Sequence, residues 1–162
     1  MRRDLSATFA LAVSVCAGPP VSAQTEATRP DMSIPECHFS RPAAVIASLK
    51  DAPDIASEFK RLGLAVADVR EPFIPYDVFD GSKNLPHRQF LRAYTFVDRT
   101  IGWYYHGGLG THIHVFELRK QIDFEPGASR EPVLRVTGAS LSGPPCEATQ
   151  ALLDGVRGPN DW

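Results

Sequence analysis

The stretch that decides the fold is Arg88–Arg119, which reads RQFLRAYTFVDRTIGWYYHGGLGTHIHVFELR. It combines the densest run of aromatic and β-branched residues in the chain with three of the five histidines. Such residues favour the pleated surface of a β-sheet. Two breaks, Asp98-Arg99-Thr100 and Gly107–Gly110, divide the stretch and suit turns, the second because glycine reaches positive φ without strain. The stretch therefore predicts a three-stranded antiparallel meander within about residues 89–118.

The length of the second turn decides which side chains share a face of the sheet. If Gly107–Gly110 is a four-residue hairpin loop, His106 pairs with Thr111 and Trp103 pairs with His114. Directly opposite residues point to the same side, and a shift by one residue exchanges the two sets. On this register one face is aromatic and carries two imidazoles. It is the candidate binding surface, with the residues Tyr94, Phe96, Trp103, Tyr105, His112, His114 and Phe116. The alternative is that another layer, such as Arg70–Pro86, covers this face.

His112 and His114 are the sharpest chemical feature of the sequence. Alternate residues of a strand point the same way, so the two imidazoles lie close enough to share a metal ion. A zinc site needs a third protein ligand. On the register above His106 and Glu117 both point to the other face. We therefore expect no bound metal or cofactor, with His112 and His114 as the candidates should a metal bind, and we assign no catalytic residue.

The first residues have the form of an export signal. Arg2 and Arg3 begin it, an apolar run covers Ala7–Ala17, and Val21-Ser22-Ala23 fits the small-residue rule for cleavage. We expect residues 1–23 to be removed and the mature chain to be periplasmic or secreted. The apolar run is too short to remain as a membrane anchor. The Arg2-Arg3 pair leaves open whether export uses the general or the twin-arginine route.

The cysteines indicate a disulfide bond, and the net charge limits the kinds of binding partner. Beyond residue 23 the only cysteines are Cys37 and Cys146, and an even pair in an exported chain predicts a disulfide bond. The net charge of −2 gives no basic footprint, which argues against nucleic acid as a partner. The partner expected is a small molecule or a protein that the sequence does not identify.

Helical patterns flank the meander. Ser40–Lys50 and Asp51–Leu62 predict two N-terminal helices, each with a capping residue and a proline in the first turn. Cys146–Leu153 predicts a C-terminal helix, and Val133–Leu141 is a candidate fourth strand. The fold class expected is α+β, an antiparallel sheet of three to five strands with all three helices packed on one face. The disulfide would then tie the first helix to the last.

The length of 162 residues is typical of one domain. We expect residues 24–36 to be a flexible linker, residues 37–155 a single α+β domain, and residues 156–162 a loose tail.

Three classes of function fit these features. The favoured one is an exported, disulfide-stapled module with a binding or structural role and no catalysis. The second is a periplasmic enzyme that uses His112 and His114, with or without a metal. The third is an inhibitor or accessory protein that docks another protein. The sequence contains no G-x-S-x-G elbow, P-loop or dinucleotide-binding motif, which argues against those enzyme classes.

Overall fold

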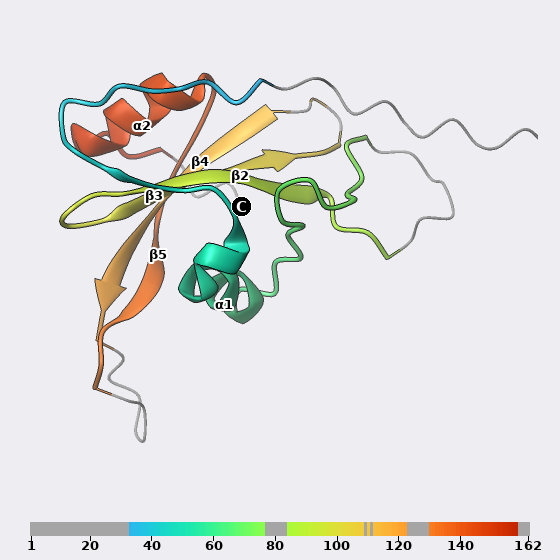
Figure 1. Ribbon diagram of the computed structural model, residues 1–162, viewed down its shortest axis with the longest axis horizontal. Helices are drawn as coiled ribbons and strands as arrows, with labels where there is room; N and C mark the ends of the chain where they lie inside the picture. The colour runs from blue at the N-terminus through green and yellow to red at the C-terminus, as the bar shows by residue number, and fades with distance from the viewer. Residues whose placement is uncertain (1–32, 77–83, 109, 111, 123–129, 159–162) are drawn as a thin grey trace, which may run out of the picture. The chain divides into compact units, whose positions relative to one another are not determined.

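A five-stranded antiparallel sheet forms the centre of the computed structural model (Figure 1). In order across the sheet, its strands are β1 (Ala44–Ile46), β2 (Arg88–Thr95), β3 (Thr100–His106), β4 (His112–Gln121) and β5 (Val133–Ser142). Each strand pairs with its neighbour in sequence, so the sheet is a meander. The structure describes residues 33–76, 84–108, 110, 112–122 and 130–158. The expected signal peptide, residues 24–32 of the expected linker and residues 159–162 of the expected tail lie outside them.

In the described part of the chain, two α-helices and one 3₁₀ turn accompany the sheet. They are η1 (Leu49–Asp51), α1 (Pro53–Arg61) and α2 (Pro145–Leu153). The expectation of two N-terminal helices is wrong, because Ala44–Ile46 forms the edge strand β1 and only the 3₁₀ turn η1 lies between it and the single N-terminal helix α1. The physical reason is that Val45 and Ile46 are β-branched and gain backbone pairing opposite Tyr94 and Ala93. Among the described residues no helix is long and apolar enough to cross a membrane.

The two α-helices lie on opposite faces of the sheet, not on one face as expected (Figure 1). Ile55 and Phe59 of α1 pack in one apolar cluster, whose sheet residues are Phe90, Ala93, Tyr104, Phe116 and Leu118. Ala148, Leu152 and Leu153 of α2 pack in another, whose sheet residues are Leu91, Tyr94, Ile101, Trp103, Tyr105, Val115 and Ala139. The first six residues of β3 are all buried. A strand that is apolar on both sides needs cover on both faces, because burying apolar surface is the main stabilising contribution.

The predicted disulfide between Cys37 and Cys146 is confirmed, with a Cα–Cα distance of 5.5 Å. It joins the segment before β1 to the first turn of α2, so it closes the α2 face of the sheet. It does not tie two helices together, since α1 packs on the other face. The described chain is therefore a disulfide-stapled domain. α2 and the disulfide lie on one face of its sheet, and α1 covers the other.

Candidate functional site

The pairing of β3 with β4 places His106 opposite His112 and Tyr104 opposite His114. The expected pairing of His106 with Thr111 is therefore wrong by one residue. Two contacts with segments distant in the sequence hold the first residue of the observed loop. The Gly107 N–H donates to the His87 carbonyl at 2.8 Å, and this bond lies beyond the last β2–β3 pair, Arg88 with His106. In addition, a Cβ on Gly107 would lie 2.2 Å from the Ile74 carbonyl oxygen, so the close packing there requires glycine.

A second constraint acts in the middle of the two strands. Gly102 lies directly opposite Phe116, and a Cβ at Gly102 would lie 2.3 Å from the ring of Phe116. The ring thus occupies the space that a side chain would fill. A shift by one residue would place Val115 or Glu117 there and would lose this packing.

The shift exchanges the face of β4, so the expected single aromatic face is not present. Its members His112, His114 and Phe116 lie on the α1 face, because they pair with His106, Tyr104 and Gly102. Its other members lie on the α2 face and are at most 5% exposed; they are Tyr94, Phe96, Trp103 and Tyr105. The Trp103 indole N–H donates to the Thr149 hydroxyl of α2 at 2.8 Å. Phe39 packs on Tyr94 and Phe96, and Phe73 packs on Tyr105. These four aromatic side chains therefore belong to the interior of the α2 face, which α2, Phe39 and Phe73 cover together.

The same shift brings three histidines together at one end of β3 and β4. One ring nitrogen each from His106, His112 and His114 lies within 4.8 Å of the others. The Nε2 atoms of His112 and His114 are 2.7 Å apart. In a tetrahedral zinc site with bonds of about 2.0–2.1 Å, the nitrogens are separated by roughly 3.3 Å. Small side-chain rotations would therefore bring all three nitrogens to metal-binding distance. We call these residues the histidine trio.

Hydrogen bonds to the other ring nitrogens orient two members of the trio. His112 Nδ1 lies 2.5 Å from the Gly110 carbonyl, and because a carbonyl only accepts, Nδ1 carries the proton. Its Nε2 is then a lone pair directed toward His114. In the 2.7 Å contact His114 Nε2–H therefore donates to His112 Nε2, and the Ser140 hydroxyl, 3.5 Å from His114 Nδ1, is placed to donate to it. A metal ion would replace the proton between the two Nε2 atoms, and His114 Nδ1–H would then donate to Ser140. Such contacts to the far nitrogen fix ring orientation in metal sites.

Burial controls the protonation of His114, which is 3% exposed. Desolvation lowers the pKa of His114 from 6.5 to about 4, and His112, His106 and Arg88 add to the effect by disfavouring another positive charge. At neutral pH His114 is thus a neutral imidazole, the form that binds a metal. His112 is the most exposed of the trio, so an ion or small ligand has access from that side.

Two further side chains line the trio on the same face of the sheet. Arg88 of β2 lies directly opposite His106. Tyr104 is fully buried and stacks on His114, with ring centroids 5.0 Å apart and planes inclined by 12°. Sequence reasoning considered His106 as a third ligand but placed it on the other face, and it did not identify Arg88 or Tyr104 as site residues. A loop one residue longer between the second and third strands would have placed His106 and Tyr104 beside the His112-x-His114 pair.

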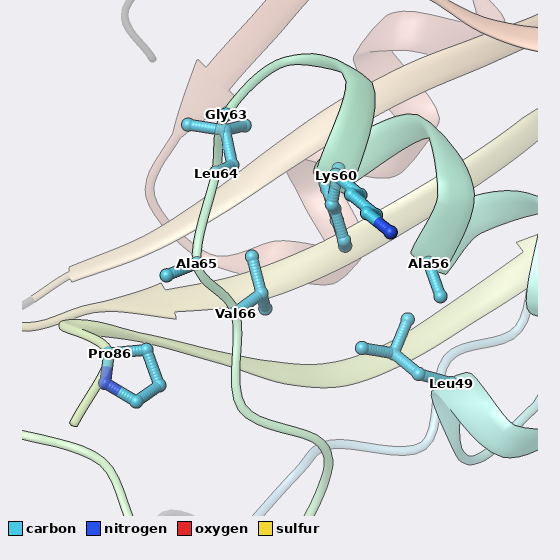
Figure 2. A pocket seen from close by; sticks show the side chains of 9 residues that line it. Leu49, Ala56, Lys60, Gly63, Leu64, Ala65, Val66 and Pro86 are labelled. Carbon is cyan, nitrogen blue, oxygen red and sulfur yellow. The ribbon is translucent and has the colours of Figure 1, made fainter. Parts of the chain in front are cut away.

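An apolar groove of about 500 Å³ lies on the α1 side of the fold (Figure 2). It is lined by Leu49, Ala56, Phe59, Lys60, Gly63, Leu64, Ala65, Val66 and Pro86. Figure 2 shows α1 and the 63–66 segment as its walls, with Pro86 at one end and Leu49 at the other. Phe59 makes an edge contact with Tyr104 at 6.5 Å between centroids, so one ring connects groove and trio. Lys60 is the one ionisable residue of the lining, so the chemistry resides in the trio and not in the groove.

No protein-family model, curated protein or solved structure matches this chain. The assignment of a function therefore depends on the geometry of the histidine trio and its neighbours.

Proposed function

We propose that this protein binds a divalent transition-metal ion of the zinc type through His106, His112 and His114. The observation that carries the proposal is the convergence of three ring nitrogens within 4.8 Å on two adjacent strands. Three protein nitrogens and one open position are the arrangement of catalytic zinc sites, whereas structural zinc sites use four protein ligands. Imidazole ligands suit zinc, copper, iron and nickel.

The surroundings of the trio favour metal binding over simple packing. If one of three closely spaced imidazoles were protonated, its positive charge would be costly at such short contacts. His114 resists protonation because it is buried. Contacts at Nδ1 orient His112 and His114, and their Nε2 atoms meet in a hydrogen bond whose proton a metal ion would replace. The proposal makes the protein a metal-dependent binding module or enzyme whose substrate would enter at the open position.

Metal analysis of the purified protein tests the proposal. After removal of metal by chelator, reloading with zinc and dialysis, we expect about one zinc per chain. His106→Gln, His112→Gln and His114→Gln should each lose most of it, since two imidazoles bind zinc weakly. Cobalt loading should give the visible absorption of a tetrahedral site in the parent protein only.

His38→Gln is the matched control, because His38 is exposed and is not part of the trio. It should keep the metal, and circular dichroism should show that all variants are folded. If the parent protein retains no zinc, or if His106→Gln retains as much as the parent, the metal site does not exist as proposed.

We also propose that the protein works outside the reducing cytosol, in the periplasm or as a secreted protein. The supporting observations are the Cys37–Cys146 disulfide, which persists in oxidising compartments, and the signal-like sequence of residues 1–23. Native protein should resist alkylation of Cys37 and Cys146 until a reductant is added, and its mass should correspond to a chain that begins at Gln24. Alkylation without reductant, or an intact Met1, would contradict this compartment.

A further inference from the structure

Arg88 occupies an unusual position beside the histidine trio. It lies directly opposite His106 in the β2–β3 ladder, and directly opposite residues share a face of the sheet. Its Nε is buried and has no hydrogen-bond partner. No carboxylate in the described part of the chain forms an ion pair with it. A guanidinium in this state is able to bind a carboxylate or phosphate oxygen, since it offers several N–H donors in one plane.

Tyr104 supplies a second unpaired donor in the same place. Its ring stacks on His114, while its hydroxyl oxygen is buried and without a hydrogen-bond partner. Among the residues that the structure describes, Arg88 Nε and Tyr104 Oη are the two buried side-chain polar atoms in this state. The guanidinium of Arg88 lies close to both rings, because its charge acts on Tyr104 and His114. Burial raises the pKa of Tyr104, and Arg88 opposes this rise by its charge and by its approach to the hydroxyl, although the two groups do not reach hydrogen-bonding geometry. Buried polar groups normally have partners, so two orphaned donors in one cluster indicate a missing acceptor.

The charge of the site identifies the kind of acceptor. The groups that act electrostatically on His114 are His112, His106 and Arg88, and none of them is an acid. Three neutral imidazoles would not compensate the charge of a divalent ion, and Arg88 adds a further positive charge. A group that balances this charge at the open position must be an anion with oxygen acceptors.

We infer that Arg88 and Tyr104 form an oxyanion-binding subsite next to the histidine trio, which takes a small carboxylate or phosphate. One oxygen of the anion accepts from Arg88 Nε–H and Tyr104 Oη–H, and another oxygen occupies the open position of the metal. This inference rests on the proposed metal site. It narrows the ligand class to oxyanions and makes Arg88 and Tyr104 ligand-binding residues with no role in holding the metal.

Titration of cobalt-loaded protein tests the subsite. Inorganic phosphate and acetate are added separately, and binding is followed by the visible spectrum and by calorimetry. We expect at least one of the two anions to bind, with affinity at least tenfold weaker in Arg88→Gln and severalfold weaker in Tyr104→Phe. A preference for phosphate or for acetate shows which class of oxyanion the subsite takes. Lys120→Gln removes the same charge from an exposed position of β4 and should bind both anions like the parent.

The outcomes separate the inference from the proposed function. If the metal is retained by all variants but Arg88→Gln binds both anions as tightly as the parent, or neither anion binds the parent, the subsite is refuted and the metal site stands. If the parent binds no metal, the titration is repeated on the metal-free protein. Anion binding that depends on Arg88 then supports the subsite without the metal, whereas binding that is absent or independent of Arg88 refutes both.

Discussion

Two buried polar clusters lie on opposite faces of the sheet, and they differ in how completely their groups are paired. On the α2 face the carboxylate of Glu117 is 1% exposed and accepts from Arg99 at 2.8 Å, from Arg119 at 3.0 Å and from Thr137 at 2.9 Å. On the α1 face the histidine trio adjoins Arg88 Nε and Tyr104 Oη, which have no hydrogen-bond partner within the described chain. The two clusters are separated by the thickness of one sheet.

This difference in hydrogen bonding indicates that the Glu117 cluster stabilises the fold, whereas the cluster of the histidine trio is suited to a ligand. Burial alone would raise the pKa of Glu117, but hydrogen bonds from Arg119 and Thr137 and the charges of Arg119 and Arg157 lower it. That cluster is complete without any ligand. An unpaired buried donor costs about 1–3 kcal/mol, so the α1 cluster lowers stability until a ligand completes it. Three variants test this contrast, from the largest expected effect to the smallest.

Glu117→Gln should break the complete cluster. Removing the buried anion leaves Arg99, whose side chain is 10% exposed, without its inner partner, so we expect a loss of about 3–5 kcal/mol in the free energy of unfolding. Urea unfolding measures it. Asp98→Asn is the control, because Asp98 also pairs with Arg99 but is 44% exposed and should cost less than about 1 kcal/mol. Equal losses in the two variants would mean that the α2 cluster is no more structural than a surface pair.

His114 should make the metal-free protein sensitive to mild acid. Its pKa is about 4 in the folded state and near 6.5 when unfolded, so between these values the unfolded chain binds a proton that the folded chain does not. Stability is then complete above pH 6.5 and falls as the pH decreases toward 4, by roughly 3 kcal/mol in total. The charges that act on His114 are those of His112, His106 and Arg88, and all of them oppose its protonation, while Tyr104 and Ser140 face it as uncharged groups.

The acid sensitivity is measured by urea unfolding between pH 7 and pH 4.5. The slope is compared between pH 7 and pH 5.5, because Glu58 and Glu117 have a folded pKa below 4.5 and begin to lower stability only where the unfolded chain's carboxylates become protonated, as the pH approaches 4.5. In His114→Gln the slope over this interval should become much smaller. An unchanged slope would show that other groups cause the acid sensitivity.

Tyr104→Phe should have the smallest effect and the opposite sign. It removes a buried hydroxyl that has no partner and keeps the ring that stacks on His114, so stability without ligand should be unchanged or higher by up to about 1 kcal/mol. Tyr94→Phe on the α2 face is the matched control, because its hydroxyl accepts from Arg92 at 3.1 Å. It should lose about 1 kcal/mol. If Tyr104→Phe loses as much, its hydroxyl has a protein partner and is not free for a ligand.

Local sequence predicted the positions of the three strands within residues 88–119. A bulge near the start of β2 changes which of its residues point to which face of the sheet. Aromatic and β-branched residues favour extended backbone whatever lies around them, which is why β2, β3 and β4 occur where the pattern places them. The pairing of β2 with β3 shifts between Phe90 and Arg92. As a result Phe90 packs on the α1 face and Leu91 on the α2 face. No local signal marks this bulge.

The helices, too, were predicted in position but not in the face of the sheet that each one covers. The spacing of Ile55 and Phe59 predicts α1, and the residues after Pro145 predict α2, because apolar residues at helical spacing need a surface to pack on. The sequence pattern does not say which face of the sheet each helix covers. Both faces of β3 are apolar and need cover, so the helices are divided between the two faces of the assembled sheet.

The sequence by itself determined the strand-forming stretch, the pairing of Cys37 with Cys146, and the common direction of His112 and His114. Each of these depends on backbone preference, on the number of cysteines, or on the two-residue period of a strand. Only the tertiary structure decided that His106 joins the pair and that Arg88 and Tyr104 stand beside it. The physical reason is that strand register has a period of two, so one residue more in a loop moves every side chain of β4 to the other face. Gly107 at the start of that loop contacts Ile74 and His87, which lie in segments that local sequence does not place beside it.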